Sequence, residues 1–261
     1  MPIYALLGAT GGTGSAILHC LLSQPPADLT LNILVRSKDK LLAAFPKIEA
    51  TTAIRVKIVQ GISTDLVAVK QCLEGASVIF NVVATNESKA GLSLIHDTAG
   101  TVIDTLASLQ TTNKEHYTKP TVIQLRSGSL NTELNSGTPW VVTWFLAFCL
   151  HYVYSDIVRA SQLYERTVRN QPDLLDYIYI DPPALHGAGR TKRTGYELIS
   201  KGTVVNGVSY ADLGAAFCEV ASRGDEFRGK SVGLVGTGEV DETWDVLLYY
   251  NWLGAKSRVF G

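Results

Sequence analysis

Three regularly spaced glycines follow a short apolar run near the start of the chain. Gly8, Gly11 and Gly14 lie in IYALLGATGGTG (residues 3–14), and SAILHCLL (15–22) continues with helical apolar spacing. A strand that ends at glycine before a helix exposes backbone N–H groups, which bind the pyrophosphate of a dinucleotide. The spacing predicts such a site, with a tight turn that holds no ligand as the alternative.

A basic turn follows the second apolar run. LNILV ends at Val35, and Arg36, Ser37 and Lys38 come next. In a dinucleotide-binding fold this turn lies beside the adenosine ribose, where an acidic residue favours NAD. A guanidinium instead pairs with a 2′-phosphate. Arg36 therefore predicts NADP(H), with a solvated turn that starts the next helix as the alternative.

The elements that position these turns alternate along the chain. Apolar, β-branched runs are separated by segments with helical spacing, which is typical of βαβ units and a parallel sheet covered on both faces. We expect an α/β, Rossmann-type doubly wound, mostly parallel sheet in one domain (1–261) with a small C-terminal substrate-binding portion. The expected strands are 3–7, 31–35, 54–59, 78–83, 121–125, 177–180 and 232–235.

Composition limits the partners and the compartment. The chain has 261 residues, a formal net charge of -1 and four cysteines without a CxxC pair. Near-neutral charge gives no reason to expect nucleic acid or an acidic membrane, and the separated cysteines suggest neither a metal site nor a disulfide framework. The chain enters its first strand without a basic leader, so we expect a cytoplasmic protein with reduced, packed thiols.

The most apolar stretch is WVVTWFLAFCLHYVY, residues 140–154. It is shorter than the roughly 20 residues that a membrane-spanning helix needs. We therefore expect a buried helix or one at an interface, and leave a homodimer open.

Four motifs together resemble a known family: GATGGTG, LVRSKDKL, VIFNVVATNE and VSYADLGAAFCEVA. The chain is similar to the NmrA-like, atypical short-chain dehydrogenases/reductases, above all to averufin-oxidase-like members of fungal secondary metabolism. The resemblance implies pyrophosphate contacts from the first motif, a 2′-phosphate contact from the second, and contacts to adenine, ribose and nicotinamide from residues after later strands. These implied cofactor-binding residues are Gly8, Thr10, Gly11, Gly12, Thr13, Gly14, Arg36, Ser37, Val83, Ala84, Thr85 and Pro182.

One departure from the family pattern concerns proton transfer. Typical members carry YxxxK, in which the lysine lowers the tyrosine pKa. None of the eleven tyrosines has a lysine four residues later. The corresponding region offers Tyr152, Tyr154 and Arg159, and an arginine supplies fixed charge but does not shuttle protons near neutral pH.

Three places at the carboxyl ends of strands are candidates for chemistry. The first is Ser127 with Ser129, where the resemblance implies a hydrogen bond to the substrate carbonyl and a polar turn is the alternative. The second is Tyr152 or Tyr154 with Asp156 and Arg159, where the tyrosines would lie just before a helix that Ser155 or Asp156 caps. Packing in a core or dimer seam is the alternative for these aromatic residues.

The third candidate is Asp181, at the end of an apolar strand. An unpaired carboxylate is costly there, so Asp181 either pairs with Arg159 or Arg126 or serves as an acid or base. His186 also titrates in a useful range, although an exposed loop histidine is the commoner case.

These features predict an NADPH-dependent oxidoreductase that reduces a carbonyl, imine (iminium) or conjugated double bond of a bulky hydrophobic natural-product intermediate. Segments around 139–156 and 183–209 would cover this substrate. In the latter, Arg190, Lys192 and Arg193 form either a basic lid or a solvated loop. Two alternatives remain open. One is a redox-coupled or redox-neutral cyclase or isomerase (Diels-Alderase-like) in alkaloid or polyketide biosynthesis, and the other is a non-catalytic NADP-sensing regulator.

Overall fold

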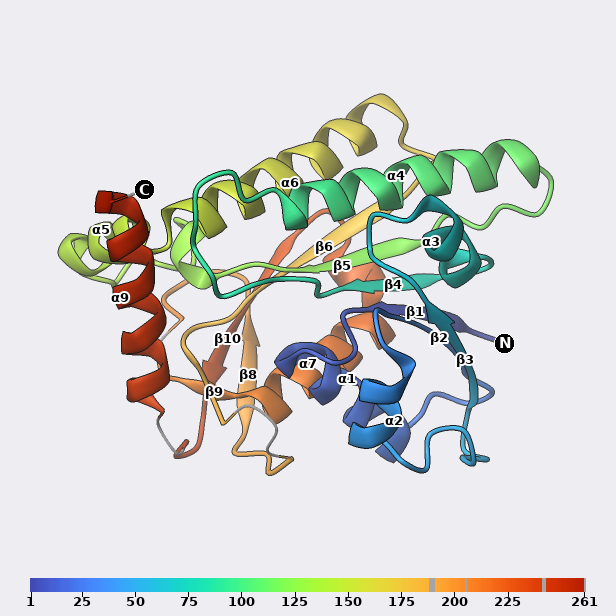
Figure 1. Cartoon of the computed structure of the whole chain (residues 1–261), viewed down its shortest axis with the longest axis horizontal. Coiled ribbons are helices and arrows are strands. Elements are labelled where there is room, and N and C mark those ends of the chain that lie inside the picture. The colour runs from blue at the N-terminus through green and yellow to red at the C-terminus, as the bar shows by residue number, and fades with distance from the viewer. Residues whose placement is uncertain (188–190, 205, 241–242, 261) are drawn as a thin grey trace.

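The computed structural model describes residues 1–187, 191–204, 206–240 and 243–260. In these ranges the main sheet has eight strands in the order β3-β2-β1-β4-β5-β6-β10-β8 (Figure 1). All neighbours pair in parallel except β8, which runs antiparallel to β10. The strands are β1 (Ile3–Leu7), β2 (Thr30–Val35), β3 (Arg55–Gln60), β4 (Val78–Asn81), β5 (Thr121–Leu125), β6 (Asp176–Asp181), β8 (Tyr196–Ile199) and β10 (Ser231–Gly236), and β7 (Leu185–His186) pairs with β9 (Val208–Ser209) outside this sheet.

Helices cover both faces of the sheet. On one face pack α1, α2 and α7, and on the other pack α3, α4 and α6 (Figure 1). The helices are α1 (Gly12–Ser23), α2 (Lys38–Ala44), α3 (Leu66–Leu73), α4 (Leu94–Thr112), α5 (Trp140–Cys149), α6 (His151–Asn170), α7 (Tyr210–Ser222), α8 (Gly224–Phe227), α9 (Trp244–Phe260) and the 3-10 turn η1 (Gly128–Leu130).

The uniformly apolar strands follow from this double cover. Tyr4 and Leu6 of β1 belong to the core beside α1 and α7, whereas Ala5 and Leu7 belong to the core beside α3 and α4. Because successive side chains of a strand point to opposite faces, both sets must be apolar. The prediction of a Rossmann-type sheet is confirmed.

The segment after Asp181 is part of the core. Helix α7 packs along α1, and a Cβ atom added at Gly214 would collide with the backbone of Ala16. Buried Phe217 and Val220 join the same core as β1 and β4. Helix α7 is therefore part of the core of the Rossmann-type domain.

The stretch 140–154 differs from the expected single helix, buried or at an interface. It is divided between α5 and α6, which meet at a bend of 91°. Only Cys149 of α5 is buried, while Trp140 and Trp144 are 77% and 60% exposed. Helix α6 begins at His151, so Asp156 lies within it and does not cap it. Apolar composition alone does not distinguish a core helix from one whose apolar face meets solvent.

Candidate functional site

The glycine turn between β1 and α1 is held by close backbone contacts. Gly8 has a φ of +97°, and the Gly11 N–H donates to the Gly8 carbonyl at 3.0 Å. A Cβ atom at Gly14 would collide with that same carbonyl. Glycine is therefore required at position 8 for its conformation and at position 14 for the close approach.

This turn leaves the N-terminus of α1 open to an anion. Gly11 is the N-cap and supplies no side-chain hydrogen bond, and no acidic residue lies in the first turn. The first N–H groups of a helix have no partner within it, so they attract a phosphate. Gly11 is exposed, Thr10 and Gly12 are half-buried, and Thr13 is buried. The geometry fits the pyrophosphate of a dinucleotide.

Residues after β4 and β2 lie at the same edge of the sheet. The Val82 carbonyl and the Val83 nitrogen lie 3.0 and 3.2 Å from the position of a Cβ on Gly8, so Val83 borders the glycine turn. Ala84 is exposed beside it, and the Thr85 hydroxyl accepts from the Glu87 N–H at 3.1 Å. Their contact with adenine and ribose stays a prediction.

Arg36 is exposed directly after β2, where a 2′-phosphate would lie in a dinucleotide fold. The hydroxyl of Ser37 caps α2 by accepting from the Lys40 N–H at 3.2 Å. The Ser37 hydroxyl is therefore already engaged in capping α2, whereas the exposed Arg36 side chain is accessible to a ligand.

Three hydroxyl groups meet beyond the carboxyl end of β5. The Tyr154 hydroxyl lies 2.6 Å from Ser129 Oγ and 3.4 Å from Ser127 Oγ, and the two serine oxygens are 2.9 Å apart. Ser127 follows β5, Ser129 lies in η1, and Tyr154 comes from α6. The structure therefore brings together three residues that the sequence suggested as two separate places.

Burial governs the protonation of this cluster. It raises the pKa of Tyr154 above its usual value, although hydrogen bonds with Ser127 and Ser129 act in the opposite direction. The position four residues after Tyr154 is Val158, so no lysine charge there lowers the pKa. At neutral pH Tyr154 is a phenol, which can donate a proton but cannot act as a base.

Asp181 forms an ion pair with Arg126. The guanidinium contacts both carboxylate oxygens, at 2.8 and 2.7 Å, and Asn131 donates to Asp181 at 2.9 Å. Arg126 also donates to Ser231 Oγ and lies over the ring of Tyr179. Of the partners considered for Asp181, Arg126 is the one observed. The bidentate contact satisfies a buried carboxylate and links β5 to β6 and β10.

Arg159 pairs with Asp156 instead. Its guanidinium donates to the Asp156 carboxylate at 3.2 Å and to the Leu92 carbonyl at 2.6 Å. The same carboxylate is fully buried and accepts from the N–H groups of Ile95 and His96 at the start of α4. Asp156 and Arg159 therefore connect α6 to the start of α4. A catalytic role for Arg159 stays a prediction.

Removing the Asp156 carboxylate should destabilise the fold. Asp156→Ala leaves two N–H groups of α4 without their acceptor, and we expect the free energy of unfolding to fall by about 3 kcal/mol. Arg159→Ala should cost about 1 kcal/mol, because that side chain is 47% exposed. Urea unfolding of both variants measures the difference, and equal losses would contradict the capping role.

Pro182 and His186 follow β6. The Pro182 carbonyl accepts from the Gly128 N–H at 2.9 Å, which fixes η1 beside the end of β6. His186 is buried, and its Nδ1 accepts from the Thr243 N–H at 3.0 Å. The expectation of an exposed loop histidine is therefore wrong. Of the basic lid, Lys192 and Arg193 are exposed, and Arg190 lies outside the described residues.

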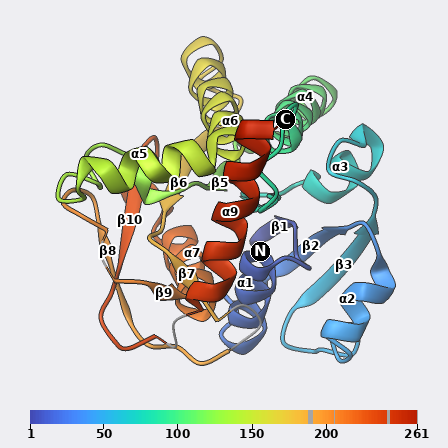
Figure 2. The ribbon, with the colours of Figure 1, turned by 60° about the vertical axis from the view of Figure 1, so that its left-hand side comes forward.

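Two features of this edge were not predicted from the sequence. The ring of Tyr210 lies 2.6 Å from the position of a Cβ on Gly12, so it packs against the glycine turn. Helix α9 extends from the region of α7 and β9 to α5 (Figure 2), and a Cβ on Gly254 would collide with the Cys149 carbonyl. Tyr210 lies in the quoted VSYADLG motif, but its distance in sequence from Gly12 hides the contact.

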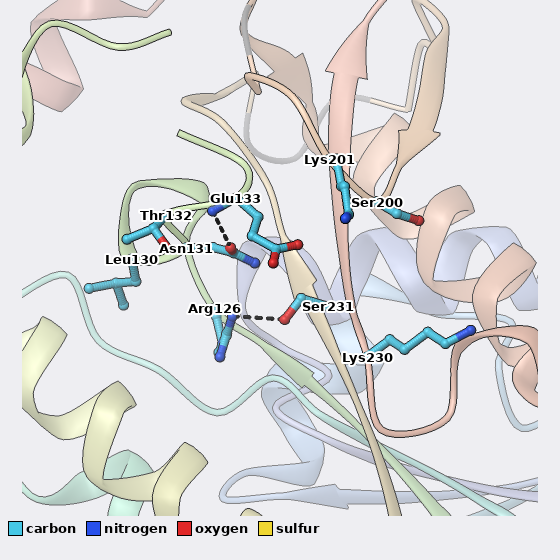
Figure 3. Close-up of a pocket in the computed structure, with 9 residues that line it drawn as sticks. All are labelled: Arg126, Leu130, Asn131, Thr132, Glu133, Ser200, Lys201, Lys230 and Ser231. Carbon is cyan, nitrogen blue, oxygen red and sulfur yellow. Dashed lines mark hydrogen bonds between the residues drawn. The ribbon is translucent and has the colours of Figure 1, made fainter. Parts of the chain in front are cut away.

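A polar pocket of about 470 Å³ lies beside the Arg126–Asp181 pair (Figure 3). Its walls carry charged and hydrogen-bonding side chains and one leucine, which does not suit a bulky apolar substrate. The lining residues are Arg126, Leu130, Asn131, Thr132, Glu133, Ser200, Lys201, Lys230 and Ser231. Ser127, Ser129 and Tyr154 are not among them.

Within the described ranges, no group of three His, Cys, Asp or Glu side chains is arranged to hold a metal ion. No single described helix has the length and apolarity to cross a membrane, and the one pair that qualifies jointly, α5 with α6, is bent by 91°.

Sheet order, glycine turn and open helix N-terminus define a dinucleotide-binding protein of the Rossmann type. The family described as NAD(P)H-binding matches residues 8–223, and the chain belongs to it. Averufin oxidase A of Dothistroma septosporum is 51% identical over 263 residues, covering 99% of this chain and 92% of that protein. Averufin oxidase A of Aspergillus flavus is 45% identical, covering 99% and 91%.

A solved short-chain dehydrogenase/reductase (wide type) from Veillonella parvula in complex with NADP has the same fold. Its TM-score is 0.65 at 20% identity, over 91% of this chain and 95% of that one. Together these comparisons place the chain in the NAD(P)H-binding family beside the averufin oxidases, with a fold shared with short-chain dehydrogenases/reductases. The protein is an oxidoreductase that binds NAD(P)H.

Proposed function

We propose that this oxidoreductase transfers hydride between NADP(H) and an oxygen-bearing carbon of a bulky hydrophobic substrate, with averufin as the first candidate. The hydroxyl cluster of Ser127, Ser129 and Tyr154 carries the proposal. It lies at the carboxyl edge of the parallel sheet, where ligands bind in this fold and where the glycine turn also opens. The averufin assignment rests on the names of the relatives.

Residues of this chain bind the substrate oxygen and donate a proton to it. When bound, NADPH supplies the hydride. The Tyr154 phenol donates a hydrogen bond to the substrate carbonyl oxygen and transfers its proton as negative charge develops there. Ser129, 2.6 Å from the phenol, and Ser127 hold that hydroxyl in place and share the charge left on Tyr154. In the reverse direction the same oxygen would have to be ionised before it could accept a proton, which its raised pKa disfavours at neutral pH.

The substrate would be covered by the segments around 139–156 and 183–209. Part of the first, α5, presents Trp140, Trp144 and Phe145 to solvent. An apolar face of this kind can bury a large hydrophobic molecule more effectively than the polar pocket beside Arg126. In the second segment, residues 188–190 and 205 lie outside the described ranges.

A turnover assay tests the proposal. Purified protein is mixed with averufin and either NADPH or NADP⁺ while nucleotide absorbance and products are followed together. We expect one nucleotide oxidised or reduced for each molecule of product. A new ring connectivity without a net change in nucleotide would establish the cyclase or isomerase alternative. Tight nucleotide binding without any product would overturn the choice of averufin, and the same result with other bulky carbonyl compounds would overturn hydride transfer.

Arg36 should set the preference for NADPH over NADH. Arg36→Asp removes a charge-assisted pair with the 2′-phosphate and adds repulsion, so NADPH affinity should fall about 30- to 150-fold, equivalent to about 2 to 3 kcal/mol. NADH affinity should change little. Lys40→Asp, at a neighbouring exposed position, is the matched control in calorimetric titrations. An equal loss for both nucleotides would refute the assignment.

A further inference from the structure

Two cysteines lie side by side where α1 packs along α7. The helices contact in a constant register: Tyr210 meets Gly12, and Gly214 meets Ala16, each four residues further along. One more turn brings the register to Cys20 and Cys218. The close contact of Gly214 with the Ala16 backbone thus lies one turn before the two thiols, and both helices run in the same direction.

The thiols themselves confirm this register. Cys218 Sγ lies 4.0 Å from the Ile17 carbonyl on α1, and the thiols of Cys20 and Cys218 are within hydrogen-bonding reach of each other. Both are free and half-buried, whereas Cys72 and Cys149 are buried in other parts of the core. The pair is therefore the one place, among the described cysteines, where two sulfur atoms can react together.

The surroundings also activate one of the two thiols. The hydrogen bond from Cys218 and the charge of Arg193 lower the pKa of Cys20 to about 7, against the opposing effect of burial. The same hydrogen bond and burial raise the pKa of Cys218. For comparison, burial raises the pKa of Cys72 to about 12. At neutral pH a substantial share of Cys20 is thiolate, the form that reacts with oxidants.

We propose that Cys20 and Cys218 form a reversible disulfide that links the cofactor-binding helix α1 to α7 when the protein meets a peroxide. The Cys20 thiolate attacks one oxygen of hydrogen peroxide, the O–O bond breaks, and Cys20 becomes a sulfenic acid while hydroxide leaves. The Cys218 sulfur then attacks the Cys20 sulfur, the S–O bond breaks and water leaves. In total two thiols lose two protons and two electrons, and one peroxide becomes two waters.

The disulfide would affect the cofactor site through the two helices that border it. Helix α1 carries the open N-terminus and the glycine turn, and Tyr210 at the start of α7 packs against Gly12. A covalent bond two turns further along restrains both helices relative to each other. The inference does not depend on the substrate or on hydride transfer, because it concerns thiol chemistry alone.

The experiment treats the intact protein with hydrogen peroxide at neutral pH and maps peptides by mass spectrometry without reduction. We expect a peptide pair joined through Cys20 and Cys218, a loss of two of the four thiols titrated after denaturation, and full recovery with dithiothreitol. In Cys218→Ser the linked pair should vanish, and a sulfenic-acid probe should label Cys20.

Three results would overturn the proposal. They are a disulfide between two chains through Cys20, oxidation of Cys20 to sulfinic acid in the wild-type protein without any linked pair, and no change in either thiol. Since the wild-type protein alone yields the linked pair or does not, poor folding of a variant would not obscure the answer. Cys72 and Cys149 serve as internal controls and should remain reduced.

Discussion

Replacing Tyr154 with phenylalanine should lower kcat by about 10²- to 10⁴-fold, the usual contribution of a positioned proton donor. The ring remains, so packing around α6 and the affinity for NADPH should be nearly unchanged. What is lost is the hydroxyl that lies 2.6 Å from Ser129. Steady-state kinetics with the substrate identified by the turnover assay, together with calorimetric titration of NADPH, separates these two effects.

Tyr152→Phe is the matched control, because this neighbouring ring packs against His151 and Arg258, and the serine hydroxyls bond to Tyr154 instead. Ser129→Ala should have a smaller effect than Tyr154→Phe, since Ser127 still contacts the phenol. Burial raises the pKa of Tyr154, and the proton is lost only as pH rises through that raised pKa. Reduction should therefore show no loss of its acid between neutral pH and about pH 9. Full activity of Tyr154→Phe would remove this residue from the mechanism.

Two alanine substitutions in the glycine turn should damage different properties: Gly14→Ala the stability of the fold, and Gly11→Ala the binding of NADPH. In Gly14→Ala the new methyl group collides with the Gly8 carbonyl, so the turn must open. We expect the free energy of unfolding to fall by about 3 kcal/mol, as overpacking at a rigid contact typically requires. In Gly11→Ala the methyl lies 3.4 Å from the Gly8 carbonyl, an ordinary contact, and φ is -84°. The fold should be kept.

The Gly11→Ala variant should instead lose NADPH binding. Its methyl group stands at the exposed N-cap of α1, next to the N–H groups that would hold the pyrophosphate. We expect affinity to fall at least about tenfold, which is about 1.4 kcal/mol. Urea unfolding and NADPH titration of both variants give the comparison. Normal NADPH affinity in a folded Gly11→Ala protein would place the pyrophosphate elsewhere.

The fold was largely readable because its signals are local. Seven apolar runs coincide within a few residues with β1 to β6 and β10, since a strand buried on both faces is apolar along its length. Strand β8 (Tyr196–Ile199) was not predicted. It is short, partly exposed and defined by antiparallel pairing with β10, more than thirty residues away. Likewise the exposure of α5 depends on what packs against it, which its own residues do not encode.

The sequence by itself determined the chemistry that each local motif can perform. The glycine spacing predicted the dinucleotide turn, and Arg36 indicated NADP(H). Because no tyrosine has a lysine four residues later, the sequence also excluded the tyrosine–lysine pair that typical family members use for proton transfer. These conclusions need only neighbouring residues, because backbone conformation and charge at a turn are local properties.

Only the tertiary structure decided which distant side chains share a site. It joined Tyr154 to Ser127 and Ser129, gave Asp181 to Arg126, and left Arg159 with Asp156. Likewise it placed Cys20 beside Cys218, nearly two hundred residues further along the chain. Such pairings follow from the order of the strands and the packing of the helices. If a helix packed in a different register, its side chains would meet different partners.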